Sequence, residues 1–412
     1  MMNKIPKGWE VKKLGEICEI NPKTEILLLN ESDEVSFIPM ASVEAETNIF
    51  TESKSKFSKV KKGYTKFRDN DILFAKITPC MENGKICIVN NLKFGIGFGS
   101  TEFHVIRPNK NTLSKYIYYF VSQISFRQMA QIYMTGAVGQ RRVPSKILEN
   151  FEIPLPPLSE QKAIVDKLDD SFAKIENAIT NLINAKENLK LYKQSVLKSA
   201  FNGDLLPNTS PTHWEVKKLG EIFNIVRGGS PRPIKSYLTD DKNGINWIKI
   251  GDIETGSKYI THTKQKILAS GLKKSRAVKA GDLLLTNSMS FGRPYISKIN
   301  GAVHDGWLIF EPKIQISKDY VFYFFSSSDT YSKLSNLAVG STVKNLQINF
   351  LENFEIPLPS LSEQNLIVAE IDKRFEVVDK TLNLIDKSIQ NAKNLKQSIL
   401  KKAFSGELRS DI

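Results

Sequence analysis

Residues 148–165 read LENFEIPLPPLSEQKAIV, and residues 351–368 read LENFEIPLPSLSEQNLIV, so that 15 of 18 positions are identical. A second segment, WEVKKLGEI at 9–17, returns unchanged at 214–222. The two offsets, 203 and 205 residues, are close to half of the 412-residue chain. Because repeats of this length and identity do not arise by convergence, the chain is an internal tandem duplication whose halves should share one fold.

A long helix is expected after each proline-rich segment. Pro154, Pro156 and Pro157 exclude helix, whereas Ser159 suits an N-cap and Gly203 suits a stop. The second half repeats this plan with Ser362 and Gly406, and KQSVLKSAFNGDL at 193–205 returns as KQSILKKAFSGEL at 396–408. Apolar side chains recur every three or four residues at Ile164, Leu168, Phe172, Ile175, Ile179, Leu182, Leu189 and Val196, and at Ile367, Ile371, Phe375, Val378, Leu382, Ile385, Ile389, Ala392 and Ile399. Each helix should be roughly 64 Å long, at about 1.5 Å per residue.

The apolar stripe of each helix predicts a coiled coil with its twin. The expected interface comprises Leu168, Phe172, Ile175, Ile179 and Leu182 with Ile371, Phe375, Val378, Leu382 and Ile385. Antiparallel pairing would give a rod of pseudo-two-fold symmetry, with a similar globular domain near each end. The alternative is that each helix packs only on its own globular domain.

The expected fold class is α+β, with two similar mixed, β-rich globular domains joined by the two helices. The predicted boundaries are 1–157, 158–206, 207–360 and 361–412, alternating domain and helix. Strands are expected at DILFAKI (71–77), KICIV (85–89) and DLLLTN (282–287), and packed helices are expected to begin at YIYYFVSQI (116–124) and YVFYFFSS (320–327).

Composition favours a globular protein with a polyanionic partner. Hydrophobic residues make up 41% of the chain, charged residues 25%, and the net charge is +14. The helical segments 158–202 and 361–405 carry only small surpluses of one and two, which leaves about +11 for the rest. With no apolar run near the ~20 residues of a membrane span and no apolar leader, the protein is expected to be cytoplasmic, with no membrane partner.

The two halves agree at helix starts and ends but diverge through the globular parts, as expected of one scaffold that carries two variable surfaces. Arg, Gln, Asn and Lys can distinguish base edges in the DNA major groove. The candidate DNA-binding residues are Lys76, Thr78, Gln140, Arg141 and Arg142 in the first half, and Asn287, Ser288, Arg293, Ser341, Thr342, Lys344 and Asn345 in the second. A solvated loop side chain is the alternative at each position, and His104 and His304 are expected to be structural.

Motifs for catalysis are not found. The sequence has no G-x-x-x-x-G-K-[ST] phosphate loop, no G-x-S-x-G elbow and no N/D-P-P-Y/F tetrapeptide of amino-methyltransferases. RGGSPRP (227–233) lacks the strand and helix context of a dinucleotide fold. Cys18, Cys80 and Cys87 lack zinc spacing and are expected to be reduced and packed as small apolar residues. We therefore expect a binding protein with no catalytic residues, metal or cofactor of its own.

The duplicated segments carry a family resemblance. IPLPPLSEQKAIV and IPLPSLSEQNLIV, each opening a helix that ends AFNGDL or AFSGEL, resemble conserved regions of type I restriction-modification specificity subunits. WEVKKLGEI resembles the start of their target recognition domains. DILFAKITPCMENGKICIV and STEFHVIRP in the first half, with GDLLLTNSMSFGRP and HDGWLIF in the second, are similar to recurring sequences of those domains.

The resemblance implies that each domain reads one half of a split double-stranded DNA site, with a spacer set by the helices. It further implies that the helices dock two modification subunits, which bind S-adenosylmethionine and methylate adenine at N6. Restriction subunits that hydrolyse ATP with Mg²⁺ and cleave DNA would join them. Because the two domains differ, the expected target is asymmetric. The alternatives are a bivalent protein-binding scaffold and an orphan or silent specificity subunit.

Overall fold

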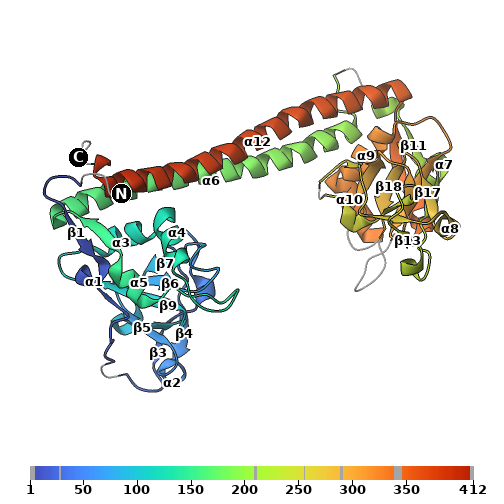
Figure 1. Ribbon diagram of the computed structural model, residues 1–412. Coiled ribbons are helices and arrows are strands. Elements are labelled where there is room, and N and C mark those ends of the chain that lie inside the picture. The colour runs from blue at the N-terminus through green and yellow to red at the C-terminus, as the bar shows by residue number, and fades with distance from the viewer. Residues whose placement is uncertain are drawn as a thin grey trace. The chain divides into compact units, whose positions relative to one another are not determined.

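The chain forms two compact units in a computed structural model, which describes residues 5–26, 29–207, 211–254, 256–287, 291–337 and 346–408 (Figure 1). Unit 1 comprises the residues up to Leu182 together with those from Lys387 onwards, and unit 2 comprises Ile183–Asp386. Each unit therefore contains one globular domain and part of both long helices.

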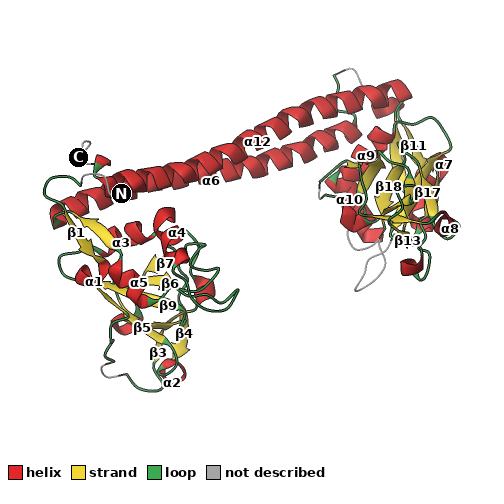
Figure 2. Cartoon of the chain, viewed as in Figure 1, coloured by secondary structure: helices red, strands yellow, loops and turns green. Residues whose placement is uncertain are grey.

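The first globular domain is built on two four-stranded sheets and one two-stranded ribbon (Figure 2). One sheet has the order β2-β9-β6-β7, the other has the order β4-β3-β8-β5, and β1 pairs with β10. The strands are β1 (Glu10–Lys13), β2 (Cys18–Ile20), β3 (Glu34–Ile38), β4 (Ser53–Lys56), β5 (Thr65–Arg68), β6 (Ile72–Ala75), β7 (Ile86–Ile88), β8 (Ile96–Gly99), β9 (Phe103–Pro108) and β10 (Glu152–Leu155). The helices are α1 (Leu14–Ile17), α2 (Phe57–Val60), α3 (Ser114–Val121), α4 (Ile124–Ile132) and α5 (Ser145–Asn150), with 3-10 turns η1 (Met40–Ser42) and η2 (Lys93–Gly95).

Strand β6 lies between two hydrophobic cores. Successive side chains of a strand point to opposite faces. Accordingly, Ile72 and Phe74 join the core that contains α3 and the long helices, whereas Leu73 and Ala75 join a second core. All four side chains are fully buried, which explains the continuous apolar run in the sequence.

The second globular domain repeats this plan. Its sheets have the orders β12-β21-β18-β19-β15 and β13-β16-β14-β20-β17, and β11 pairs with β22. The strands are β11 (Glu215–Lys218), β12 (Phe223–Arg227), β13 (Leu238–Thr239), β14 (Ile245–Ile248), β15 (Tyr259–Ile260), β16 (Gln265–Ile267), β17 (Arg276–Val278), β18 (Leu283–Thr286), β19 (Pro294–Ser297), β20 (Gly301–Val303), β21 (Trp307–Pro312) and β22 (Glu355–Leu358). The helices are α7 (Leu219–Ile222), α8 (Ala269–Leu272), α9 (Lys318–Ser326), α10 (Ser328–Leu337) and α11 (Ile348–Glu352), with 3-10 turns η3 (Pro211–His213), η4 (Ile234–Ser236) and η5 (Ile250–Asp252).

The repeated sequence segments form repeated contacts. Val11 of WEVKKLGEI pairs with Pro154, and Val216 of the second copy pairs with Pro357 in the same antiparallel register. The strands and the packed helices predicted at 71–77, 85–89, 282–287, 116–124 and 320–327 are present, although each strand is shorter than its apolar run.

The long helices are α6 (Leu158–Asn202) and α12 (Leu361–Ser405). Gly203 and Gly406 follow them with φ of +82° and +80°, a backbone conformation that favours glycine as a helix stop. The predicted N-caps Ser159 and Ser362 are wrong, because both residues lie inside the helices. Ser360 caps α12 instead: its hydroxyl accepts from the Glu363 N–H at 3.3 Å, and the Glu363 carboxylate accepts from the Ser360 N–H at 3.1 Å.

The two long helices pair in antiparallel fashion within each unit (Figure 1). In unit 1, Lys396 of α12 forms an ion pair with Glu176 of α6 at 2.8 Å. In unit 2, Lys186 pairs with Asp386 at 2.6 Å and Lys193 pairs with Asp379 at 2.5 Å, so partners recede along α12 as they advance along α6. The α+β class, with β-rich domains and long antiparallel helices, is thereby confirmed.

The expected coiled-coil residues face the interior, but the helices do not pack on one another alone. Leu168, Phe172, Ile175, Ile371, Val378 and Ile385 are buried, and Ile179, Leu182, Phe375 and Leu382 are half-buried. Leu168 and Phe172 also belong to the core of the first domain, and Ile371 belongs to that of the second. Pairing with the twin helix and packing on a globular domain therefore both occur.

Candidate nucleic-acid interface

The five candidate residues of the first domain lie together. The Thr78 N–H donates to the Arg141 carbonyl at 3.0 Å, and the Val143 N–H donates to the Lys76 carbonyl at 2.9 Å. Segment 76–78, which follows β6, therefore runs beside segment 140–143, which precedes α5. Residues that are more than 60 positions apart in the sequence thus form one polar surface.

A short hairpin loop presents part of this surface. Thr135 and Arg142 exchange two backbone hydrogen bonds of 2.9 and 2.8 Å, which close residues 135–142 into a loop. Gly136 and Gly139 have φ of +119° and +81°, so the turn depends on glycine at both positions. Val138 at the tip is fully exposed.

Arg142 holds this loop in place. Its guanidinium donates to both carboxylate oxygens of Glu102, at 2.8 and 2.7 Å, and to the Gln140 carbonyl at 2.9 Å. The hydrogen bonds from Arg142 lower the pKa of the Glu102 carboxyl, and the nearby charge of Lys76 adds to this effect. Three hydrogen bonds to Glu102 and Gln140 thus let Arg142 position this loop, while its side chain remains 41% exposed, and its predicted contact with DNA stays a prediction.

The remaining candidates of the first domain differ in availability. Gln140 and Arg141 are exposed, although Arg141 donates to the Met134 carbonyl at 2.8 Å. Lys76 is half-buried near Glu102, and the Thr78 hydroxyl donates to Glu82 at 2.7 Å. Gln140 and Arg141 are thus the side chains of this set most open to a ligand.

His104 has the structural position expected of it. Its Nε2 lies 2.7 Å from the Val143 carbonyl, and its Nδ1 lies 2.9 Å from the Asn21 amide nitrogen. Burial lowers the pKa of His104, which favours the neutral ring. The side chain ties β9 to the segment that carries Arg142.

Fewer candidates of the second domain can be placed. Ser288, Ser341, Thr342, Lys344 and Asn345 lie outside the described residues. Asn287 is 2% exposed, and its Oδ1 is buried without a hydrogen-bond partner among the described residues. Arg293 is exposed, and Thr286 exchanges backbone hydrogen bonds with residues 292 and 293, which brings Arg293 close to the end of β18.

A groove in the second domain was missed by sequence reasoning. It has a volume of about 1160 Å³, an apolar floor that includes Trp247, and three cationic side chains, Arg232, Lys235 and Lys249. Arg232 and Lys235 belong to or follow RGGSPRP, which was considered only as a nucleotide loop. The signal that could have revealed the groove is the absence of acidic residues from 227–239.

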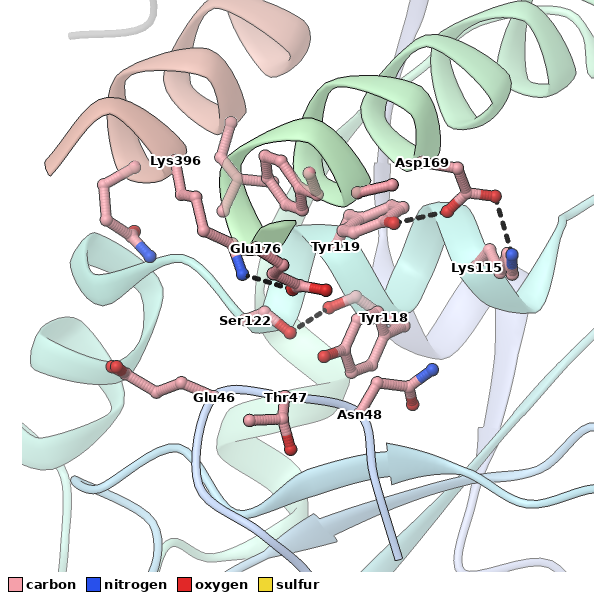
Figure 3. Close-up of a pocket in the computed structure, with 14 residues that line it drawn as sticks. Glu46, Thr47, Asn48, Lys115, Tyr118, Tyr119, Ser122, Asp169, Glu176 and Lys396 are labelled. Carbon is pink, nitrogen blue, oxygen red and sulfur yellow. Dashed lines mark hydrogen bonds and ion pairs between the residues drawn. The ribbon is translucent and has the colours of Figure 1, made fainter. Parts of the chain in front are cut away.

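Each domain is fixed to both long helices. In unit 1 (Figure 3), the Tyr119 hydroxyl and the Lys115 ammonium of α3 both donate to Asp169 of α6, and the Lys115 bond measures 2.6 Å. These residues line a cavity of about 180 Å³. Lys396 of α12 lies over the Phe172 ring at 4.8 Å, and its neighbour Gln397 accepts from the Ile124 N–H at 3.0 Å.

Unit 2 repeats these contacts with the roles of the helices exchanged. Tyr323 of α9 donates to Asp372 of α12, and Lys193 of α6 lies over the Phe375 ring at 4.7 Å. Gln194 accepts from the Ser328 N–H at 2.7 Å, as Gln397 does from Ile124. The duplicated sequence therefore encodes one docking arrangement, used twice.

The sequence of the chain matches the model of a known protein family. The model of the type I restriction modification DNA specificity domain matches twice, at residues 6–185 and 211–394. The chain belongs to this family. Each specificity-domain match covers one globular domain and more than half of the long helix that follows it.

Several named specificity subunits are similar to this specificity-domain protein. The EcoEI specificity subunit of Escherichia coli is 32% identical over 304 residues, which cover 60% of this chain and 51% of that protein. The match to the EcoAI subunit likewise covers 51% of its length, so the chain matches about half of these relatives. The MjaVIII specificity subunit of Methanocaldococcus jannaschii is 27% identical over 98% of this chain and 94% of its own length.

Solved structures show the same fold. A chain of a type I R-M system superposes with a TM-score of 0.79 at 23% identity, covering 98% of this chain and 99% of that one. The HsdS subunit from Thermoanaerobacter tengcongensis gives a TM-score of 0.62, again at 23% identity and with the same coverage. Among the described residues of this specificity-domain protein, no helix is long and apolar enough to cross a membrane.

Proposed function

We propose that this protein is the non-catalytic DNA-recognition subunit of a type I restriction-modification complex. The observation that carries the proposal is the pair of specificity-domain matches, each on a globular domain that is docked on the helices by the same contacts. The surfaces of the two domains differ, as expected if each domain recognises different bases. The net charge of +14 supports a nucleic-acid partner.

In this proposal, each domain reads one half of a bipartite, asymmetric site in double-stranded DNA. Phosphate contacts of Lys and Arg would supply affinity, and side chains such as Gln140 and Arg141 would supply base discrimination, at about 1–3 kcal/mol per base pair. The helix pair would set the spacer between the half-sites, because each domain is fixed to both α6 and α12.

The chemistry would belong to partner subunits. The helices would dock two modification subunits that carry S-adenosylmethionine and methylate adenine, and restriction subunits with ATP and Mg²⁺ would complete the complex. Exposed apolar side chains on the helices support a protein partner there: Leu191, Leu366, Val377, Leu384 and Leu395 are each more than half exposed.

The test is to purify the chain with the modification subunit of its host and to sequence the DNA methylated by the complex. A split, asymmetric motif with N6-methyladenine in both halves is expected. A palindromic motif would contradict the asymmetric target. A stable complex without methylation would indicate a silent specificity subunit, and failure to form any complex would favour a bivalent protein-binding scaffold.

A further inference from the structure

The two recognition domains place their positive charge on different parts of the same fold. The segment between β2 and β6, residues 21–70, has eight Lys and Arg against eight Asp and Glu. Its counterpart between β12 and β18, residues 228–281, has eleven against four. The rest of each domain shows the reverse. Residues 71–157 of the first domain have ten Lys and Arg against five Asp and Glu, and residues 282–360 of the second have six against seven. The excess of positive charge in the second domain therefore falls within residues 228–281, the segment that contains Arg232, Lys235 and Lys249.

The groove of the second domain lies within its basic segment. Arg232, Lys235 and Lys249 line it, and the Arg232 side chain is 82% exposed. The Lys249 ammonium donates to the side chain of Gln265, the first residue of β16, at 2.9 Å. Asp305 is the only carboxylate among the lining residues that the structure describes; it accepts from the Ser230 hydroxyl at 2.8 Å and lies 3.6 Å from Arg232.

The floor of the groove is apolar and firmly held. Trp247 is buried, and Pro231, Ile234 and Leu238 extend the apolar lining. The loop that carries Arg232 is pinned by a close backbone approach at its start, since a Cβ at Gly228 would lie 2.1 Å from the His304 carbonyl oxygen. A preformed concave surface with an apolar floor and a cationic rim matches a nucleic-acid strand, whose sugars are apolar and whose phosphates are anionic.

We propose that this groove is the surface through which the second domain binds one strand of its DNA half-site. Phosphates bind Arg232, Lys235 and Lys249, and the deoxyribose faces and base edges lie against the apolar floor. The first domain binds DNA through the surface formed by segments 76–78 and 135–142, where the Lys76 N–H donates to the Glu102 carbonyl as the Asn287 N–H donates to the Gly306 carbonyl in the second domain. This inference rests on the proposed function and adds the residues that would carry it out.

The test uses the full chain assembled with its modification subunit and a duplex of random sequence. The variant R232A/K235A/K249A is compared with K54A/K56A/K59A, which removes three exposed lysines from the neutral segment of the first domain. Affinity is measured across a salt series. The slope of log K against log salt should fall by about 2.7 in the groove variant, at about 0.9 per phosphate contact, and should change by less than about 1 in the control. On a second duplex that carries the methylated motif of the parent complex, methylation of the second half-site should fall more than tenfold in the groove variant.

The outcomes separate this inference from the function on which it rests. If the parent complex does not bind DNA with steep salt dependence, the proposed function fails. If the parent binds and the groove variant keeps its slope, the groove inference is overturned and the function stands. Loss of complex assembly with an unchanged slope would also overturn it, because the groove would then bind a protein. The conservative variant R232K/K249R, which keeps the charges, should retain the parental slope, and equal unfolding midpoints would exclude misfolding.

Discussion

In the two globular domains, different side chains pack over a left-handed glycine at equivalent positions. Gly84 and Gly292 both have a left-handed backbone, with φ of +72° and +75°. In the first domain, the buried Arg127 lies over Gly84, so that a Cβ there would be 2.5 Å from the guanidinium. In the second domain, Tyr331 occupies that place, 43% exposed and stacked on Phe291.

The difference shows which parts of a duplicated protein are free to change. The docking contacts of Gln397 and Gln194, and of Lys396 and Lys193, are kept because they hold the domains to the helices. The side chains that pack over the glycines, Arg127 and Tyr331, differ because each contacts only its own domain. Predictions that separate the two domains therefore concern paired positions.

The largest difference is expected at Asp71 and Asp282. Asp71 forms a bidentate ion pair with Arg107, both at 2.7 Å, with side chains 1% and 10% exposed. Asp282 meets Lys318 at 3.2 Å, and both side chains are 27% exposed. Asp71→Ala should lower the free energy of unfolding by about 3–5 kcal/mol, because it strands a buried guanidinium. Asp282→Ala should cost about 1 kcal/mol. Urea unfolding of each variant measures both, and equal losses would contradict the comparison.

The stability losses on removing the side chains that pack over Gly84 and Gly292 should differ less. Arg127 donates to the Glu82 carbonyl and to the Glu46 carboxylate, both at 2.6 Å. Arg127→Ala should cost about 2–3 kcal/mol, since it removes charged hydrogen bonds inside the domain. Tyr331→Ala should cost about 1 kcal/mol, the value of a partly exposed aromatic contact. Hydrogen exchange of β7 and β19 reports each domain separately, and a larger opening in the second domain would refute the ranking.

Base discrimination should respond to the exposed pair of the first domain. The double variant Gln140→Ala/Arg141→Ala should methylate the first half-site less selectively, because both side chains are exposed. The free-energy difference between the correct and a wrong base pair should fall by about 1–3 kcal/mol for each base that they contact. Methylation of the second half-site serves as the internal control. Equal weakening of both halves would mean that these residues supply only general affinity.

The smallest effect is expected for the Glu102 carboxylate, and it should disappear in acid. Hydrogen bonds from Arg142 lower the pKa of Glu102 in the folded state, so the stabilisation is complete above the unfolded value of about 4.3 and is lost as pH falls through the lower folded value. Glu102→Gln should therefore reduce stability at pH 7 by less than about 1 kcal/mol, because the Arg142 side chain is 41% exposed and solvent screens the pair, and should have no effect well below pH 4. Thermal unfolding across pH 3–7 measures this. A loss that persists in acid would exclude the charge as its origin.

The helices and the duplication could be predicted from sequence because they depend on local periodicity and on repeated letters. The cap positions could not, because the choice between Ser360 and Ser362 depends on where Glu363 can reach back to the chain. Arg142 was expected to contact bases, and nothing local reveals that Glu102, 40 positions away, engages it. The groove was missed for a related reason, since Arg232 and Lys235, which precede β13, approach Lys249, which follows β14, only when β13 and β14 both pair with β16.

The division of the helices between the units reverses the order in which the protein can be completed on the ribosome. Unit 2 is contiguous, from Ile183 to Asp386, and can close its core as soon as that stretch has emerged. The core of the first domain includes Leu400, Phe404 and Leu408, and the Phe404 ring packs 5.0 Å from Tyr116. The domain that is translated first must therefore wait for Leu408 before its core can close, and its apolar face stays open until then.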